Sequence, residues 1–198
     1  MPTIGLSFPY VAKYETDGAG NVTYSDAVVL ARAVEFTTTI EAAADNNFYA
    51  DNGIAEVDNT FSDGTFELTT DELTQEASAL ILGITPSTIT VGSETVTELI
   101  YDNRIAPPYL GFGTVVKKKH RGITKWRAVI LTKTQFNIPS QAATTQGETI
   151  EWQAPTIDGV ILRDDTAFEQ WQREATFDTE LKARAYIEQI LGAPVVTP

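Results

Sequence analysis

The sequence predicts an α+β fold that is mainly β, with an antiparallel β-sandwich or barrel at its centre. Several segments alternate apolar and polar residues, turn-forming residues separate them, and two other segments have helical periodicity with end signals. The chain has 198 residues, of which 42% are hydrophobic, so it is long enough to bury a full core. It contains no cysteine. Disulfides, thiolate metal sites and thiol nucleophiles are therefore excluded.

The first half of the chain is expected to consist mostly of strands. Four segments are rich in β-branched and aromatic residues or alternate strictly: Gly5–Tyr14, Val22–Leu30, Val34–Glu41 and Thr65–Thr69. Residues 17–21 predict a turn, because their Gly, Asn and Asp tolerate positive φ. In the alternating strands one face should be buried, and the other, which carries Glu, should face water.

Residues 42–60 are predicted to form a long polar loop. The segment is rich in Asn and Asp, and loops of this length in compact domains are usually functional or disordered. It also contains apolar side chains, among them Phe48, Tyr49 and Ile54. A loop with apolar residues to bury is expected to lie on a neighbouring subunit.

Two helices are predicted from end signals and an apolar stripe. The first begins with the capping box Thr69-Thr70-Asp71-Glu72 and ends at Gly83. The second runs from Thr179 to Leu191, and Gly192 stops it. The expected apolar stripes are Leu73, Ala77, Leu80 and Ile81 in the first, and Leu181, Ala185, Ile187 (or Tyr186), Ile190 and Leu191 in the second.

The second half of the chain is expected to contain a central hairpin and further strands. Tyr109–Val116 and Lys125–Thr134 form the hairpin, with Lys117–Thr124 as its tip. The other expected strands are Ile150–Pro155, Thr156–Leu162 and a short one at Trp171–Phe177. The alternation around Trp152 places this side chain in the core. The chain is thus divided into a β domain at 1–162, containing the 42–60 loop, and a C-terminal extension at 163–198 with a helix at about 179–191.

Charge is distributed very unevenly along the chain, whose net charge is −13. Residues 1–103 carry a net charge of −15, residues 104–133 carry eight bases and no acid, and residues 134–198 carry −6. So acidic a protein repels a polyanion, which argues against an ordinary DNA-binding protein. The basic segment alone could form a nucleic-acid patch, but a solvated hairpin tip or a contact between copies is favoured. This uneven distribution of charge predicts that one face of a subunit attracts a different face of another copy.

Catalytic and metal-binding motifs are lacking in the sequence. The only histidine, His120, lies within a cationic run and is expected to be exposed, so no His-based triad or metal site is predicted. With 27 acids, carboxylate pairs will lie close by chance, and none can be selected. Asp45 and Asn47 begin like a calcium loop, but Tyr49 and Ala50 break the pattern. We therefore expect no enzyme activity, metal or cofactor, although calcium could bind adventitiously to the Asp45–Glu56 region.

The loop residues Phe48-Tyr49-Ala50-Asp51-Asn52-Gly53, followed by Glu56, resemble a motif of the major tail tube proteins of long-tailed (siphovirus-type) bacteriophages of the phi13 type. Other positions match this family in the expected order: Gly5-Leu6, Tyr10-Val11-Ala12, Tyr24, Leu80, Gly83, Tyr109, Gly111-Phe112, Trp126, Phe136, Ile138-Pro139 and residues 154–159. The resemblance covers roughly residues 4–162. It implies a tail-tube fold in which hairpins of each subunit build one continuous barrel, with a helix packed outside it.

The resemblance also implies a function and partners. Subunits of this family form hexameric rings that stack into a tube, through which double-stranded DNA passes during ejection. The expected partners are further copies, the tail terminator, the tape measure protein and distal tail proteins. The expected location is the virion tail, assembled in the host cytoplasm, and no membrane segment or secretory signal is expected.

Three groups of residues are the expected assembly sites. Candidates for an acidic lumen, which lets DNA slide without sticking, are Glu35, Glu41, Glu67 and Glu151. The inter-subunit loop is represented by Phe48, Tyr49, Asp51, Asn52, Gly53 and Glu56. The basic ring contact is represented by Lys117, Lys118, Lys119 and Arg121.

Three alternatives remain open at the level of sequence. A carbohydrate-binding or adhesive β-sandwich would use exposed aromatic residues, with Trp126, Trp152 and Trp171 as candidates. An inner tube of a contractile tail or injection machine would share the tube fold. A carboxylate-based hydrolase is the enzymatic alternative, and no specific motif supports it.

Overall fold

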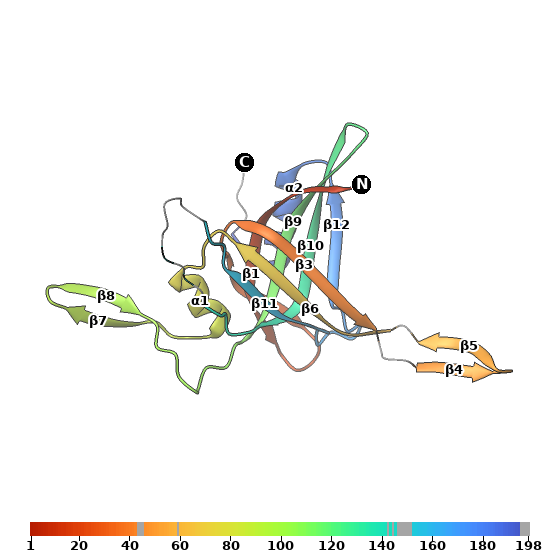
Figure 1. The fold of residues 1–198 in the computed structure, drawn as a ribbon, viewed down its shortest axis with the longest axis horizontal. Helices are drawn as coiled ribbons and strands as arrows, with labels where there is room; N and C mark the ends of the chain where they lie inside the picture. The colour runs from red at the N-terminus through yellow and green to blue at the C-terminus, as the bar shows by residue number, and fades with distance from the viewer. Residues whose placement is uncertain (43–45, 59, 142, 144, 146–151, 195–198) are drawn as a thin grey trace.

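The computed structural model is built around one curled antiparallel sheet and two helices (Figure 1). It describes residues 1–42, 46–58, 60–141, 143, 145 and 152–194. The main sheet has eight strands in the order β2-β1-β9-β10-β11-β6-β3, with β12 also paired to β10. The two halves of the sheet pack face to face as a sandwich, which confirms the predicted mainly β, α+β fold.

The elements follow one another in an order close to the predicted one. The strands of the main sheet are β1 Thr3–Thr16, β2 Val22–Val29, β3 Ala33–Ala42, β6 Phe61–Thr70, β9 Tyr109–His120, β10 Ile123–Phe136, β11 Thr156–Leu162 and β12 Gln172–Phe177. Two further hairpins are β4 Asn46–Ala50 with β5 Gly53–Asp58, and β7 Ser87–Val91 with β8 Glu94–Glu98. The helices are α1 Gln75–Leu82 and α2 Glu180–Leu191.

The sheet encloses an aromatic core between its two halves. Phe112 on β9 stacks on Phe36 of β3, with ring centroids 5.1 Å apart, and on Phe66 of β6 at 5.7 Å. Phe136 of β10 meets Phe66 edge to face. Helix α1 closes one end of this core with Ile81 and Leu82, both fully buried. Burial of these large side chains is the main stabilising term of the fold.

Strands β1, β9 and β10 are buried on both faces, because α2 covers the outer one. Ile187 and Leu191 of α2 pack with Val115, Ala128 and Ile130 in a second apolar cluster. Burial on both sides explains why residues 109–116 of β9 and 128–131 of β10 are nearly continuous apolar runs, whereas β3 and β6 alternate. β12 pairs with residues 126–131 of β10, so the segment after residue 162 contributes a strand to the main sheet.

The predicted start of the first helix is wrong. Thr69 and Thr70 belong to β6, and the N-cap is Thr74, whose Oγ1 accepts a hydrogen bond of 3.1 Å from the Ala77 amide. β6 continues into the expected capping box because Thr69 pairs with β11 and Thr70 with β3. The predicted stop is confirmed, since Gly83 has a φ of 67°.

The predicted ends of the second helix are confirmed, and its apolar stripe is partly confirmed. Thr179 caps the start and Gly192, with a φ of 69°, caps the end. Ile187 and Leu191 are buried as predicted, whereas Leu181 was expected to be buried and is exposed. Ala183 and Glu188 complete the buried side of the helix. The buried glutamate explains the error, because a charged residue on the inner face hides the stripe from a hydrophobicity pattern.

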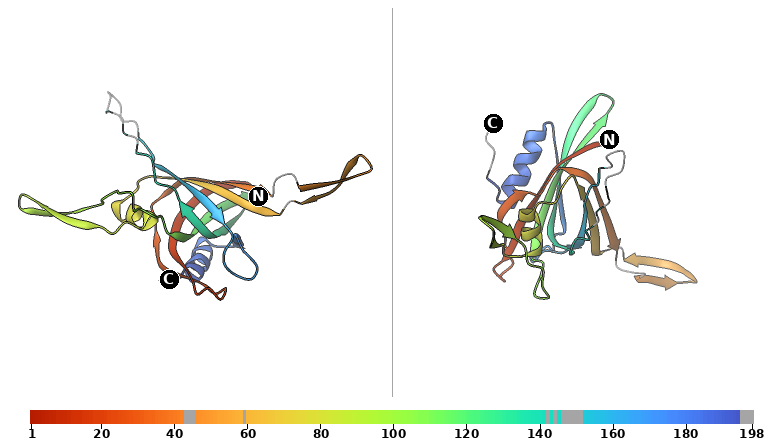
Figure 2. Two further views of the ribbon diagram at one scale, coloured as in Figure 1. Left: turned by 90° about the horizontal axis from the view of Figure 1, so that it is seen from below. Right: turned by 60° about the vertical axis from the view of Figure 1, so that its left-hand side comes forward.

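The two small hairpins project from opposite ends of the molecule (Figures 1 and 2). The predicted loop at 42–60 contains β4 and β5, so the expectation of an irregular loop is wrong for the described part of this segment. Asp51 and Asn52, between them, both have positive φ, as a type I′ turn requires. The β7–β8 hairpin was not predicted at all.

Two other predictions concern the chain before β11. Trp152 was expected in the core, but its side chain is 90% exposed. The alternation that suggested a strand lies mainly on residues 149–151, outside the described residues, and Trp152 itself belongs to no strand. Without sheet pairing, the alternation of residues carries no information about which side is buried.

Candidate assembly surfaces

The outer face of β3, β6 and β11 carries five exposed carboxylates: Glu35, Glu41, Asp63, Glu67 and Asp158. The strand register sets Asp158 opposite Glu67, and Glu41 opposite Asp63. Threonines fill the positions between them, and none of the described residues of these three strands is Lys or Arg. Directly opposed like charges destabilise a sheet, so this face maintains a negative potential at a cost in stability.

The structure thus brings three of the four predicted lumen residues onto one face. Glu35, Glu41 and Glu67 lie on adjacent strands, whereas Glu151 falls outside the described residues. Asp63 and Asp158 were missed. Asp63 lies before the predicted start of its strand, because β6 begins at Phe61, and Asp158 joins the pattern only through the register of β11 on β6. We call Glu35, Glu41, Asp63, Glu67 and Asp158 the acidic face.

The acidic face ends at an open strand edge. β3 is the last strand of the sheet on this side, and β2 is the last strand on the other. An edge strand exposes unpaired N–H and C=O groups, which can pair with a strand of another chain. A strand of a second molecule can therefore pair with the edge of β3 and extend the acidic face.

The predicted basic tip is longer and more ordered than expected. β9 and β10 run up to a two-residue turn at Arg121 and Gly122, which both have positive φ. Lys117, Lys118 and Lys119 are therefore strand residues rather than tip residues, and they alternate between the two faces of the hairpin. Among the described residues, none of these three lysines nor Arg121 forms an ion pair with an acid.

The neighbours of the three lysines differ with the face. Lys117 lies over the Trp126 ring, with Nζ 5.9 Å from its centroid. Lys118 points the other way, into a cleft that also contains Arg127. Partial burial, together with the charge of Arg127, lowers the pKa of Lys118. The four predicted residues consequently do not form a single contact surface.

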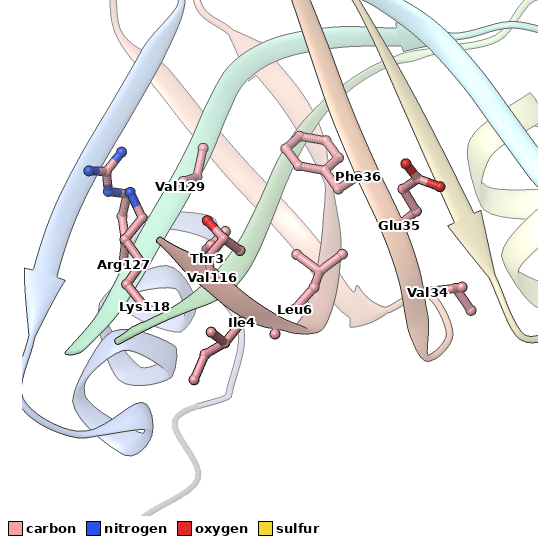
Figure 3. Close-up of a pocket in the computed structure, with 11 residues that line it drawn as sticks. Thr3, Ile4, Leu6, Val34, Glu35, Phe36, Val116, Lys118, Arg127 and Val129 are labelled. Atoms are coloured by element: carbon pink, nitrogen blue, oxygen red, sulfur yellow. The ribbon is translucent and has the colours of Figure 1, made fainter. Parts of the chain in front are cut away.

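That cleft has a volume of about 610 Å³ and lies between β9, β10 and the first residues of β1 on one side and β3 on the other (Figure 3). Its floor is apolar, with Leu6, Phe36, Val116 and Val129. Arg127 donates a 3.0 Å hydrogen bond to Glu174 through Nη1. Its Nε is buried and, among the described residues, has no hydrogen-bond partner.

The residues of the expected inter-subunit loop lie on the β4–β5 hairpin. Phe48 is opposite Glu56, and Asp51 and Asn52 form the turn before Gly53. Tyr49 is opposite Ile54, whose side chain is exposed. The hairpin projects beyond the sheet, as an arm that contacts another chain would have to do (Figure 2).

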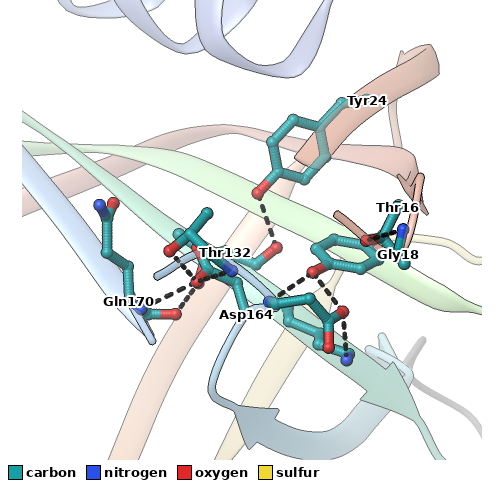
Figure 4. Close-up of polar contacts among 10 residues, drawn as sticks. Thr16, Gly18, Tyr24, Thr132, Asp164 and Gln170 are labelled. Carbon is teal, nitrogen blue, oxygen red and sulfur yellow. Dashed lines mark hydrogen bonds and ion pairs between the residues drawn. The ribbon is translucent and has the colours of Figure 1, made fainter. Parts of the chain in front are cut away.

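An acidic hollow beside the 17–21 turn is the strongest candidate for a cation site, and its geometry argues against one (Figure 4). Asp164 Oδ1 accepts hydrogen bonds from the amides of Thr166 and Gln170. Asp165 Oδ2 accepts from Tyr14 and Lys133, at 2.7 and 2.8 Å, and these bonds lower the pKa of Asp165. The carboxylates thus hold the 163–171 loop to β1 and β10, and no metal-binding cluster occurs within the described residues.

His120 is exposed, as predicted, at the end of β9. In the described part of the chain no helix is long and apolar enough to cross a membrane. Comparison of the chain with known protein families and with curated proteins found no match.

Proposed function

We propose that this protein is the structural subunit of a bacteriophage tail tube and has no enzymatic role. Copies associate into hexameric rings that stack, and double-stranded DNA passes through the central channel during ejection. The hexameric number and the expected partners, which are the tail terminator, the tape measure protein and distal tail proteins, come from the resemblance. The proposed location is the virion tail.

The acidic face is the observation that carries this proposal. A channel for DNA must not hold it, and a surface with carboxylates and no bases repels phosphate. Threonines between the carboxylates keep the surface polar without adding positive charge. We assign this face to the channel, with Asp63 and Asp158 added to Glu35, Glu41 and Glu67.

The open edges support assembly from many copies. β2 and β3 lie at opposite ends of the strand order, so each molecule has two free edges, and the β2 edge of one copy is available to pair with the β3 edge of another. Heterologous contacts of this type close into rings when the rotation between neighbours divides the circle evenly. The projecting hairpins provide further contacts between neighbouring copies.

Negative-stain electron microscopy and gel filtration of the purified protein test the proposal. We expect rings or tubes with a central hole, at least at high protein concentration or with an initiating complex. A compact monomer under all these conditions would contradict it. Tubes surrounded by a contractile sheath in the intact particle would favour the inner-tube alternative.

One observation favours a second candidate, an adhesive β-sandwich. Trp152 is 90% exposed, and large aromatic rings on a surface are suited to stacking on sugars. This module would bind glycans as a monomer, and Trp152→Ala would abolish the binding. A glycan array with the wild-type protein and this variant separates the two candidates.

A further inference from the structure

The β7–β8 hairpin has one apolar face that no part of its own chain covers. The register places Ile89 opposite Val96 and Val91 opposite Glu94, so these side chains share a face. Ile89, Val91 and Val96 are 45%, 63% and 42% exposed. The opposite face consists of threonines: Thr88, Thr90, Thr95 and Thr97.

The hairpin is poorly suited to remain alone in water. An isolated two-stranded hairpin is marginally stable at best and needs packing against another element. Figures 1 and 2 show it projecting far from the sheet, at the end opposite to β4–β5. Its exposed apolar face and its two free edges indicate that a partner covers it.

The cleft between β9, β10 and β3 has the properties that this partner needs. Its floor is apolar, and two exposed aliphatic residues, Ile4 and Val34, lie at its rim. Lys118 and Arg127 supply positive charge at one wall, and the buried Nε of Arg127 lacks an acceptor among the described residues. Glu35 is the one acid among the residues that line the cleft, and it lies on the β3 side.

The hairpin matches this cleft in apolar character and in charge. Its apolar face is bordered by Glu94 near the tip and Glu98 at the base, and nothing basic lies on β7 or β8. Apolar side chains meeting the apolar floor remove both surfaces from water. Arg127 is already paired with Glu174, so a carboxylate placed here compensates the charge of Lys118 and offers an acceptor to Arg127 Nε.

We propose that the β7–β8 hairpin of one copy docks into the cleft between β9, β10 and β3 of another copy. The hairpin lies at the far end of the molecule from the N-terminal end of β1, so it cannot fill its own cleft (Figures 1 and 2). The contact is therefore head to tail and can propagate through a ring or a row. The inference rests on the self-association in the proposed function, and it adds a specific pair of surfaces.

Cysteine cross-linking tests this contact directly, because the chain has no native cysteine. Val96→Cys in one copy and Val34→Cys in a second, differently tagged copy place one thiol on each surface. Docking holds the two thiols at a high local concentration, so the mixed dimer should form about tenfold faster than with a control. The control is Thr97→Cys, which lies on the opposite face of the same hairpin and is also exposed.

Equal rates for Val96→Cys and Thr97→Cys, or faster cross-linking of Val34→Cys with Asn52→Cys at the tip of β4–β5, would overturn the proposed contact. Glu94→Lys should slow the mixed dimer several-fold, and Lys118→Glu in the other copy should restore it; equal rates would overturn the pairing. Tubes without this cross-link would refute the contact alone, whereas the cross-link without rings or tubes would refute the tube.

Discussion

A buried polar network holds the C-terminal helix to the sheet. Tyr10 donates a 2.6 Å hydrogen bond to Glu188, which is 2% exposed, and Arg184 donates to both of them at 2.7 Å. A buried carboxylate is tolerated only when such partners satisfy it. The network therefore joins α2 to β1 through specific bonds, in addition to the apolar contacts around it.

Tyr10→Phe should lower the free energy of unfolding by about 1–3 kcal/mol, because Glu188 loses a donor. Burial, followed by the hydrogen bond to Glu188, raises the pKa of Tyr10 to about 12. The unfolded value is about 10, so this contribution is present below that pH and is lost as the pH rises through the folded pKa. Urea unfolding at neutral and alkaline pH measures both effects.

Tyr101→Phe is the matched control for this prediction. Tyr101 is 48% exposed, so its hydroxyl should contribute little to stability. Tyr14 and Tyr24 also have raised pKa values, mainly because of burial, so some alkaline loss will remain without the Tyr10 hydroxyl. A Tyr10→Phe variant as stable as wild type at neutral pH would show that the network is not coupled to folding.

Gly111→Ala should destabilise the protein by about 1–3 kcal/mol, because an added Cβ would overpack the contact that β9 makes with Tyr24 and Leu191 of the same chain. The new atom would lie 2.5 Å from Cε1 of Tyr24 and 2.9 Å from Leu191. Gly5→Ala is the control, since its nearest contact would be an ordinary 3.5 Å. Thermal denaturation of both variants gives the comparison, and similar melting temperatures would contradict it.

At the scale of elements, the caps define where the helices begin. Thr74→Ala should cost about 1 kcal/mol, because the amide of Ala77 loses its acceptor. Thr74→Ser keeps the oxygen and should retain most of the stability. Chemical denaturation of the two variants tests the cap. Equal losses for Ala and Ser would instead indicate that the methyl group of Thr74, rather than its hydroxyl, matters.

The sequence predicted most strands of the main sheet because their patterns depend on local burial. β3 and β6 alternate since one face meets the core, and β9 and β10 are apolar since both faces are covered. The start of α1 was misplaced because two candidate caps lie within six residues and sheet pairing selects between them. The β7–β8 hairpin was overlooked, although its alternation around Gly92-Ser93 is a hairpin signal.

The candidate site was only partly predictable for similar reasons. Glu35, Glu41 and Glu67 follow from alternation within single strands. Asp63 is in phase with Glu67 on the same strand and was missed because β6 begins before the predicted start at Thr65. Adding Asp158 requires the register between strands far apart in the sequence. Lys118 is separated from Lys117 and Lys119 because β9 extends through the predicted tip, where successive side chains alternate between faces. The cleft depends on how β3 curls over β9 and β10, which no local pattern encodes.

At the scale of the whole molecule, the acidic face makes a prediction about DNA release. The combined substitutions Glu41→Lys, Asp63→Lys and Glu67→Lys, none of them in the docking cleft, should stall DNA exit, because a basic channel binds phosphate through counterion release. Tubes should still assemble. Dye fluorescence follows DNA release from particles, and electron microscopy follows the tubes.

The corresponding triple Gln variant is the control for charge removal alone. It should release DNA faster than the Lys variant, because it lacks positive charge in the channel. Normal DNA release by Lys-substituted particles with intact tubes would show that this face does not line the channel.

Assembly should depend on salt more than folding does. Contacts that pair basic with acidic surfaces weaken as the screening length falls from about 10 Å at 0.1 M to about 3 Å at 1 M salt. The core is apolar, so the melting temperature of the subunit should change little. Light scattering measures tube growth at each salt concentration. Growth rates that are independent of salt would contradict the role of charge.

The two small hairpins make the two ends of the molecule different, so the molecule is polar along its long axis. β4–β5 leaves one end and β7–β8 leaves the other, so a polymer made by repeating one contact has two chemically different termini (Figure 1). One terminus displays β7–β8 hairpins that are not docked, and the other displays clefts that hold no hairpin. A soluble peptide with the sequence of the β7–β8 hairpin would consequently occupy the exposed clefts. It would block extension at that terminus and leave the other terminus free to grow.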